Sequence, residues 1–412
     1  MGNRQKALYN DDEQRENLRH TRRKHGLTKF DPKKIREELY DYFGERRRRL
    51  EIVKTTRTPN GQVLDWVPIN SQLPSGMKLA TPPSESVPLE LGSGRRRVKP
   101  VRFELEHYDA ARGPEGTVPI PRRDLKRLRF VRPLRDHLSK HGHRSYTMFI
   151  DERDSVEVPA DGSAHEYAYS SQWVTCYGAD GNLAAFDPYL HRSDEFSLLQ
   201  VAVTRGSGSG KQTIEAGWQE FRDLYGDWVP HLFVFYTTNG YTESGDNKGG
   251  YNRDVDGWVQ YSDVVYPEAI SSPNSTRGGA QYIMQIKYQL YQGNWWFCCN
   301  GRWIGYYPSS LFSTSGLRSQ AEKVAFYGEV VDSAKDAGSS WTDMGSGYWP
   351  ENHWTWSAYM SNLRYQSGTG GSMSSYSGST WESNPDEYGI ESHFDDTGSW
   401  GSHCWLGGPG GG

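Results

Sequence analysis

Two glutamates lie in stretches of the sequence where a carboxylate is unusual. Glu215 belongs to the run Thr213-Ile-Glu-Ala-Gly-Trp218, and Glu329 belongs to the run Phe326-Tyr-Gly-Glu-Val-Val331. Most of their neighbours are apolar, aromatic or glycine, a composition that is typical of β-strands. Each carboxylate therefore stands where a sheet usually keeps hydrophobic side chains. We take Glu215 and Glu329 as the candidate catalytic pair.

Two carboxyl groups that share one cleft can act as an acid and a base. They cannot both ionise cheaply, so the pKa of one rises while the pKa of the other stays low. One group can then deprotonate a water, while the other, protonated, assists the carbonyl or the leaving nitrogen of a peptide bond. A similar pair hydrolyses glycosides when its carboxyls lie roughly 5 to 9.5 Å apart. Neither reaction requires a metal ion or an organic cofactor, and we expect none.

The competing interpretation is that both glutamates are ordinary strand residues on a solvent face. The protein would then be a non-catalytic module that binds carbohydrate or proline-rich protein. Of the 15 tryptophans, 14 follow residue 150, and such a density of aromatic rings suits a binding groove as well as a core. Most of these rings are expected in the core. As substrate-binding residues we predict Trp218, Tyr236, Trp295 and Tyr306.

Charge divides the chain into two parts. Residues 1–150 hold 33 Lys and Arg against 19 Asp and Glu, a net charge of +14, whereas residues 151–412 hold 14 against 32, a net charge of −18. Opposite charges attract over about a Debye length, roughly 10 Å at 0.1 M salt. We therefore expect the basic part to dock on the acidic part of the same chain. Nucleic-acid binding by the basic part is the alternative that we set aside.

The basic part is expected to be helical at first and extended afterwards. Asp31-Pro32 provides an N-cap and a first-turn proline for a helix that ends in the cations of Arg46–Arg49, where the helix dipole favours them. Pro59-Asn60-Gly61 predicts a turn between two extended segments. Residues 68–145 are rich in Pro, Ser and Arg and predict an exposed, weakly ordered connector.

The acidic part predicts an all-β domain. Short β-rich runs follow one another between turn clusters, which favours an antiparallel sandwich of two large sheets. One or two helical turns are expected only around residues 311–325. The expected strands are residues 196–204, 213–218, 231–236, 257–261, 281–291, 295–297, 303–307, 324–331, 357–365 and 400–406.

Several features exclude or weaken other classes of protein. No apolar run is long enough to cross a membrane, and Met1–Lys6 lacks the apolar segment of a signal peptide. His137, His141 and His143 have a spacing that a metal can use, but they lie in the basic connector without an acidic or cysteine partner, so we expect no metal site there. At most two disulfides are possible, and free buried thiols are the alternative. The cysteines are Cys176, Cys298, Cys299 and Cys404.

A series of short motifs runs through the acidic part in a fixed order. They are Ile214-Glu-Ala-Gly-Trp218, Leu224-Tyr-Gly-Asp227, Leu232-Phe-Val-Phe-Tyr236, Gly278-Gly-Ala-Gln281, Gly293-Asn-Trp-Trp296, Ile304-Gly-Tyr-Tyr-Pro308, Gly328-Glu-Val330, Met344-Gly-Ser-Gly347 and Gly407-Gly-Pro-Gly410. As a set, over roughly residues 146–411, they resemble the neprosin family of glutamic peptidases. Leu50–Gln72 is more loosely similar to the activation peptide of that family.

The resemblance implies a large β-sandwich whose cleft carries two catalytic glutamates, which match Glu215 and Glu329. It also implies a secreted, extracellular proenzyme that loses its N-terminal part at acid pH and prefers to cleave after proline. Residues 1–145 would then be a basic pro-segment, and residues 146–412 the catalytic domain. We predict an acid-acting endopeptidase with protein or peptide substrates and without nucleic-acid or membrane partners.

Two departures from the family pattern concern the region around the cleft. Plant members carry a cysteine-bearing loop after the strand that matches Leu232–Tyr236, whereas this chain has Gly245-Asp-Asn-Lys-Gly-Gly-Tyr-Asn-Arg253 without cysteine. Asp343 precedes Met344 where the family pattern leads us to expect Gln. These changes bear on proline preference more than on catalysis.

Overall fold

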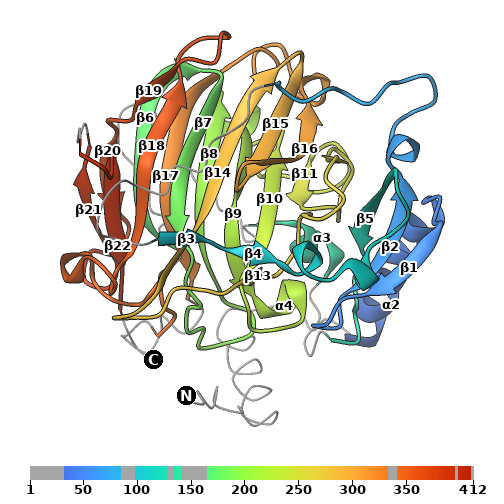
Figure 1. The fold of residues 1–412 in the computed structure, drawn as a ribbon, viewed down its shortest axis with the longest axis horizontal. Helices are drawn as coiled ribbons and strands as arrows, with labels where there is room; N and C mark the ends of the chain where they lie inside the picture. The colour runs from blue at the N-terminus through green and yellow to red at the C-terminus, as the bar shows by residue number, and fades with distance from the viewer. Residues whose placement is uncertain are drawn as a thin grey trace.

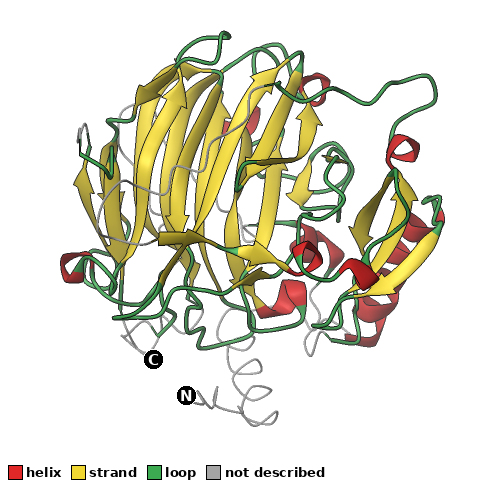
Figure 2. Cartoon of the chain, in the orientation of Figure 1, coloured by secondary structure: helices red, strands yellow, loops and turns green. Residues whose placement is uncertain are grey.

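Two large β-sheets packed face to face form most of the protein (Figures 1 and 2). The computed structural model describes residues 32–84, 98–127, 133–140, 165–332, 341–394 and 398–409. The predicted all-β fold, an antiparallel sandwich of two large sheets, is confirmed.

The seven-stranded sheet carries both candidate catalytic glutamates. All neighbouring strands in it run antiparallel. Their order is β11 (Gly249–Tyr251), β10 (His231–Thr237), β9 (Gln212–Phe221), β8 (Phe196–Arg205), β17 (Ala321–Val331), β6 (His165–Cys176) and β20 (Ser379–Glu382).

The ten-stranded sheet forms the other layer. Its main path is β12 (Val259–Gln260), β16 (Arg302–Pro308), β15 (Asn294–Cys299), β14 (Gln281–Tyr291), β7 (Gly178–Ala184), β18 (Ala358–Gln366), β22 (His403–Gly407) and β21 (Gly389–His393). Two short strands join it from the side, β19 (Met373–Ser375) beside β18 and β3 (Val98–Pro100) beside β14.

The main core lies between the two sheets, and in strands such as β9 it takes every second residue. In β9, Ile214, Ala216 and Trp218 are fully buried in this core. Because side chains alternate along a strand, Glu215 points from the opposite face of the seven-stranded sheet. That face is also buried, with Glu215 0 % exposed, so another part of the chain must cover it.

The N-terminal part contributes to this cover through Lys140, which contacts Glu215. Helix α2 (Pro32–Arg48) packs beside a three-stranded sheet of β1 (Lys54–Arg57), β2 (Val63–Pro68) and β5 (Thr117–Pro121), seen at one side of the sandwich in Figure 1. The predicted helix and the hairpin around residues 59–61 are confirmed. The short helices within the described residues are η1 (Ile69–Gln72), η2 (Glu104–Glu106), η3 (Asp109–Ala111), α3 (Leu134–Leu138), η4 (Gly208–Gly210), α4 (Arg222–Tyr225), η5 (Ser309–Leu311) and η7 (Pro350–Asn352).

The prediction of an exposed, weakly ordered connector is wrong for much of residues 68–145. Strand β3 pairs in parallel with β14, and β4 (Arg102–Phe103) pairs with β13 (Ser271–Ser272). These partners lie more than 160 residues away in sequence, so local composition could not reveal them. Parts of the same segment, such as residues 141–145, lie outside the described residues.

Two further expectations have clear outcomes. The helical turns predicted around residues 311–325 are mostly wrong, because β17 already begins at Ala321 and its alternate residues Val324 and Phe326 enter the core. The free-thiol alternative is confirmed, since all four cysteines are buried and unbridged. Among the described helices, none is both long and apolar enough to span a membrane.

Candidate active site

Glu215 and Glu329 face the same side of the seven-stranded sheet, on strands separated only by β8. The register places Ala202 of β8 opposite Glu215 and Leu198 opposite Glu329. Gln200, between these two positions, points to the same face. The structure thus brings together two glutamates that are far apart in sequence, with a glutamine between them.

The small residues of the Glu-Ala-Gly motif have a steric role at this point. Gly217 lies opposite Gln200 across the β8–β9 pair. A Cβ at Gly217 would stand 1.9 Å from the carbonyl oxygen of Leu199, so no side chain fits. The absence of this side chain leaves room beside Glu215 on the candidate catalytic face.

A single ammonium group joins the two carboxylates. Lys140 Nζ lies 2.7 Å from Glu215 Oε2 and 2.6 Å from Glu329 Oε2. These two oxygens are therefore no more than about 5.3 Å apart, the sum of the two distances. The Lys140 side chain is only 1 % exposed, and both glutamates are 0 % exposed. The three charges form a buried, compact group.

Each glutamate also accepts hydrogen bonds on its other oxygen. Glu215 Oε1 accepts from Tyr241 Oη at 2.5 Å and from Thr213 Oγ1 at 2.8 Å. Glu329 Oε1 lies 2.8 Å from His165 Nδ1 and accepts from Tyr167 Oη at 3.2 Å. Hydrogen bonds to a carboxylate favour its ionised form.

Opposing effects set the pKa values of this group. Burial alone would raise the pKa of Glu215, but the charge of Lys140 and the hydrogen bonds from Lys140, Tyr241 and Thr213 lower it below its usual value. Burial would lower the pKa of Lys140, but the two carboxylates raise it. Burial and the nearby carboxylates raise the pKa values of Tyr167 and Tyr241 well above the usual value, so both hydroxyls remain donors.

Gln200 contributes an amide to the same site. Its Oε1 accepts a hydrogen bond from Lys140 Nζ at 3.2 Å. Its Nε2 is buried and has no hydrogen-bond partner among the described residues. A buried donor without a partner is costly, and such groups often belong to functional sites.

The four predicted substrate-binding aromatic residues lie elsewhere. Trp218 and Trp295 are in the core between the sheets, where their indole nitrogens donate to the carbonyls of Ala184 and Leu317. Tyr236 belongs to the same core. Tyr306 belongs to another cluster, with Val259 and Trp296, on the ten-stranded sheet. The structure does not bring these four to the glutamates, because strand alternation directs them to other faces.

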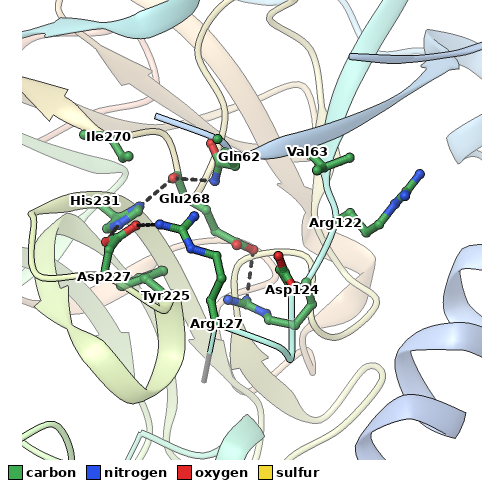
Figure 3. Close-up of a pocket in the computed structure, with 12 residues that line it drawn as sticks. Gln62, Val63, Arg122, Asp124, Arg127, Tyr225, Asp227, His231, Glu268 and Ile270 are labelled. Carbon is green, nitrogen blue, oxygen red and sulfur yellow. Dashed lines mark hydrogen bonds and ion pairs between the residues drawn. The ribbon is translucent and has the colours of Figure 1, made fainter. Parts of the chain in front are cut away.

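The basic part also docks through arginines. Arg123 enters a buried acidic pocket, where Nη2 lies 2.7 Å from Asp254 and 3.1 Å from Glu268, with all three side chains at most 6 % exposed. Figure 3 shows the pocket, lined from both parts of the chain. Beside it, Arg127 pairs with Asp227 at 3.0 Å.

Helix α2 makes a further ionic contact with the acidic part. Arg46 lies 2.5 Å from Asp246 and 2.8 Å from Asp256. Asp246 belongs to the segment of residues 245–253, which contains no cysteine. In this chain the segment therefore serves as a contact for the N-terminal helix. These ion pairs join the basic part of the chain to the acidic part.

The carboxyls of this interface differ in their response to pH. Burial would raise the pKa of Asp227, but His231 and Arg127 lower it. Burial raises the pKa of Glu268 to about 8, although Arg123 opposes this shift. Asp227 is therefore held in its ionised form, whereas Glu268 keeps a proton up to neutral pH.

Sequence reasoning missed the residues that surround the pair. Lys140 lies in a basic connector with many other cations, and no local feature of the sequence distinguishes it from them. Gln200 and Tyr167 had one usable signal, since each is a polar or hydroxyl side chain that alternates with apolar residues in a β-rich run. His165 and Tyr241 had no local signal. Of the three connector histidines, His137 is buried 3.8 Å from Asp254, and His141 and His143 lie outside the described residues.

Asp343, the third carboxylate near a family motif, is not part of the pair. It is fully buried and lies 2.6 Å from Arg277 Nη2. The neighbouring Met344 packs in the core between the sheets. Asp343, in place of the expected Gln, therefore forms a buried ion pair with Arg277. It adds no acid to the candidate catalytic face.

Comparison with known proteins gives one family match and several remote structural ones. The family described as Neprosin matches residues 193–409, just over half of the chain. A crystal structure of scytalido-glutamic peptidase with a transition state analog inhibitor is 8 % identical, covers 58 % of this chain and 97 % of its own, and has a TM-score of 0.31. SCP-B, a member of the Eqolisin family of peptidases in a complex with the tripeptide Ala-Ile-His, is 9 % identical, with coverages of 58 % and 96 % and a TM-score of 0.28.

A lectin gives a match of the same kind. CG-16, a homodimeric agglutinin from chicken liver, is 8 % identical, with coverages of 40 % and 93 % and a TM-score of 0.21. TM-scores this low support no inference about the present chain, for the peptidases or for the lectin.

Lys140→Met tests the importance of the buried ion group. Removing one partner leaves two buried carboxylates uncompensated, so we expect the free energy of unfolding at pH 7 to fall by about 3–5 kcal/mol. The pKa of Glu215 is lowered in the folded protein, so the ion group stabilises above the unfolded value of about 4.3 and loses its effect as the pH falls below it. Chemical denaturation monitored by tryptophan fluorescence should show this loss.

The matched control is Lys248→Met. Lys248 also pairs with a glutamate, Glu243, but both side chains are at least half exposed. We expect a change below about 1 kcal/mol at every pH. Equal effects of the two substitutions would contradict a special role of the Lys140 ammonium.

Proposed function

Because the chain belongs to the neprosin family, we propose that it is a glutamic endopeptidase made as a proenzyme, in which Glu215 and Glu329 activate water for attack on a peptide bond. The observation that carries this proposal is the ammonium of Lys140, bound within 2.7 Å of both carboxylates. A water molecule at the position of this nitrogen would hydrogen-bond to both groups. That is the arrangement a water-activating pair requires.

The protonation of the pair changes when Lys140 leaves. Two carboxyls this close, without a cation between them, cannot both ionise cheaply, so one takes up a proton. Glu329 keeps its direct contact with the imidazole of His165, whereas Glu215 keeps direct contacts with the hydroxyls of Thr213 and Tyr241 and an electrostatic attraction to Lys211. We assign the ionised general base to Glu329 and the protonated acid to Glu215.

Each group then has a defined step. Glu329 removes a proton from the water as its oxygen attacks the carbonyl carbon. Glu215 donates its proton to the carbonyl oxygen or, later, to the leaving nitrogen. The amide of Gln200 donates a hydrogen bond to the carbonyl oxygen while negative charge builds up there, a role for which its Nε2 has no competing partner among the described residues.

Latency follows from the position of Lys140. Its ammonium fills the place of the attacking water and holds both carboxylates in the ionised form. The arginine contacts of Arg46, Arg123 and Arg127 hold the surrounding segment in place. The basic segment, as an intramolecular partner, therefore blocks the site until it is displaced.

Acid displaces the segment through those carboxylates that are ionised in the docked form. The pKa values of Glu215 and Asp227 are lowered, so their contacts stabilise docking above about pH 4 and are lost as the pH falls. Glu268 behaves in the opposite way. Its pKa is raised to about 8, so its contribution is complete in acid and is lost as the pH rises through 8. Release in acid therefore depends on Glu215 and Asp227.

Substrate preference and location are proposed from family membership. The substrates are proteins or peptides that contain proline, cleaved on its carboxyl side, and the site of action is extracellular. The acidity of the catalytic part, with its net charge of −18, agrees with work at low pH, where much of this charge is neutralised.

Glutamine substitutions of the pair test the chemistry. At acid pH, we expect Glu329→Gln to reduce kcat on a proline-containing peptide by at least about 10³-fold, because the general base is lost. Glu215→Gln keeps a hydrogen-bond donor and should lose about 10²-fold. The measurement is peptide cleavage followed by mass spectrometry, with the mature N-terminus supplied by recombinant removal of residues 1–145.

The same assay carries its controls. A peptide with alanine in place of proline measures the proline preference independently of the pair. Full activity of either variant would exclude the catalytic pair, and equal losses would exclude the assigned roles. Binding of the peptide without any cleavage by the unsubstituted protein would favour a non-catalytic module.

Gln200→Leu tests the oxyanion role. Loss of one donor should lower kcat by about 10²- to 10³-fold with little change in KM, because the hydrogen bond strengthens as charge develops. A thermal melt checks that the fold is intact. A change confined to KM would show that Gln200 only helps to bind the substrate.

Asp227→Asn and Glu268→Gln form a matched pair that tests acid release. Asp227→Asn removes an ionised partner of Arg127 at every pH, so N-terminal processing should begin at a pH higher by roughly half a unit or more. Glu268→Gln imitates the protonated carboxyl that is already present below pH 8, so the onset should stay unchanged. Mass spectrometry of samples held between pH 7 and pH 3 gives the onset, and equal shifts would refute this mechanism.

A further inference from the structure

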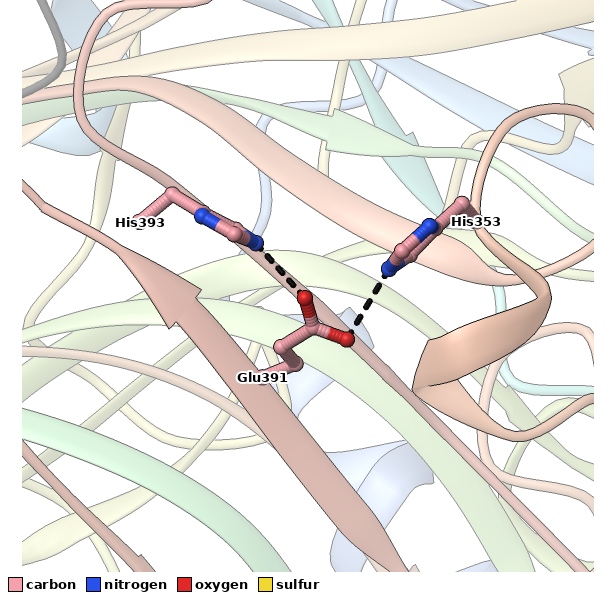
Figure 4. A group of neighbouring side chains, drawn as sticks. All are labelled: His353, Glu391 and His393. Atoms are coloured by element: carbon pink, nitrogen blue, oxygen red, sulfur yellow. Dashed lines mark hydrogen bonds and ion pairs between the residues drawn. The ribbon is translucent and has the colours of Figure 1, made fainter.

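A second group of ionisable side chains lies at the edge of the ten-stranded sheet, away from the glutamate pair. Glu391 and His393 belong to β21, the last strand in the order of that sheet. They are two residues apart and share one face of the strand. His353 comes from the turn that follows η7, and Figure 4 shows the three side chains converging.

The ligand atoms of this trio are close together. His353 Nε2 lies 2.9 Å from Glu391 Oε2, and His393 Nε2 lies 2.7 Å from Glu391 Oε1. All three ligand atoms fall within 4.8 Å of one another. Zinc binds histidine nitrogens and carboxylate oxygens at about 2.0–2.2 Å, which places ligand atoms roughly 3.3 Å apart in a tetrahedron. Small rotations of three side chains reach that geometry.

Neighbouring rings limit the freedom of the two histidines. The ring of His393 stacks on that of His403, with centroids 5.0 Å apart and planes at 17°. The ring of His353 lies against Trp405, with centroids 5.3 Å apart. His403 and Trp405 are the β22 partners of His393 and Glu391 in the register. The packed rings therefore restrict the side chains of the two histidines before a ligand binds. This reduces the side-chain entropy that is lost on binding.

The site is open to solvent. The side chains of His353, Glu391 and His393 are 49 %, 36 % and 46 % exposed. A hydrated ion can therefore reach the three ligand atoms without any opening of the fold. Two imidazoles and one carboxylate are a donor set for Zn²⁺, Cu²⁺ or Ni²⁺, whereas Ca²⁺ and Mg²⁺ require mainly oxygen ligands.

We propose that His353, Glu391 and His393 bind one divalent transition-metal ion, with Zn²⁺ as the reference ion and water in the remaining position. The ion links the turn after η7 to the edge strand β21, two segments about 40 residues apart in sequence. Its role is structural, because it closes the edge of the sheet and lies outside the candidate catalytic face. This site is independent of the peptidase function.

Titration of the full-length chain with Zn²⁺ at pH 7.5 tests the site. The titration uses a His141→Ala/His143→Ala background, which removes two of the three connector histidines as competing ligands; the third, His137, is buried. We expect one ion bound per chain and a rise in Tm of about 5 °C at 100 times the Kd. Ca²⁺ and Mg²⁺ should produce no rise.

Two variants locate the bound ion. His393→Ala should weaken Zn²⁺ binding at least about 100-fold and remove the rise in Tm, because a direct ligand is lost. His107→Ala, at an exposed histidine beside Arg102 with no carboxylate contact among the described residues, should leave both unchanged. Unaltered Zn²⁺ binding in His393→Ala, or no binding by the background protein, would overturn the proposal.

Discussion

The contact of one ammonium with two buried carboxylates determines much of this structure. Glu215 and Glu329 are fully buried, and two ionised carboxylates without a counter-ion would be very unfavourable there. Lys140 provides the charge, and its own burial is possible only because both glutamates surround it. The segment that carries Lys140 must therefore cover the sheet. The contacts of Arg46, Arg123 and Arg127 follow the same rule, since each of these arginines meets a carboxylate of the acidic part.

Strand alternation makes such a site possible in a sandwich. One face of β8, β9 and β17 supplies the core, with residues such as Trp218 and Phe326, and residues of the N-terminal part such as Trp66 join the same core. The other face is free to carry polar residues. The fold can thus place Glu215, Gln200 and Glu329 side by side without disturbing the packing between the sheets. Stability and chemistry occupy opposite faces of the same strands.

The sequence predicted what depends on local pattern and missed what depends on distant contacts. Strand composition identified Glu215 and Glu329, and turn and cap residues identified α2 and the first hairpin. The partner Lys140 could not be found, because nothing local distinguishes it from the other cations of a basic segment. The aromatic residues show the converse error. Trp218 and Trp295 have suitable chemistry for a groove, but the alternation of their strands sends them into the core.

In the proposed mechanism, one pH signal serves both latency and catalysis because both depend on the same two carboxyls. While Lys140 is bound, neither glutamate needs a proton, and the pair lacks an acid. When protons neutralise Glu215, its attraction for the ammonium falls, and the segment is held less firmly. The state that follows has one protonated and one ionised carboxyl, which is the state that water activation requires. In the proposed mechanism, protonation therefore releases the basic segment and supplies the catalytic acid in a single step. A lysine in contact with only one of the two carboxylates would not couple the release of the segment to the formation of the catalytic acid.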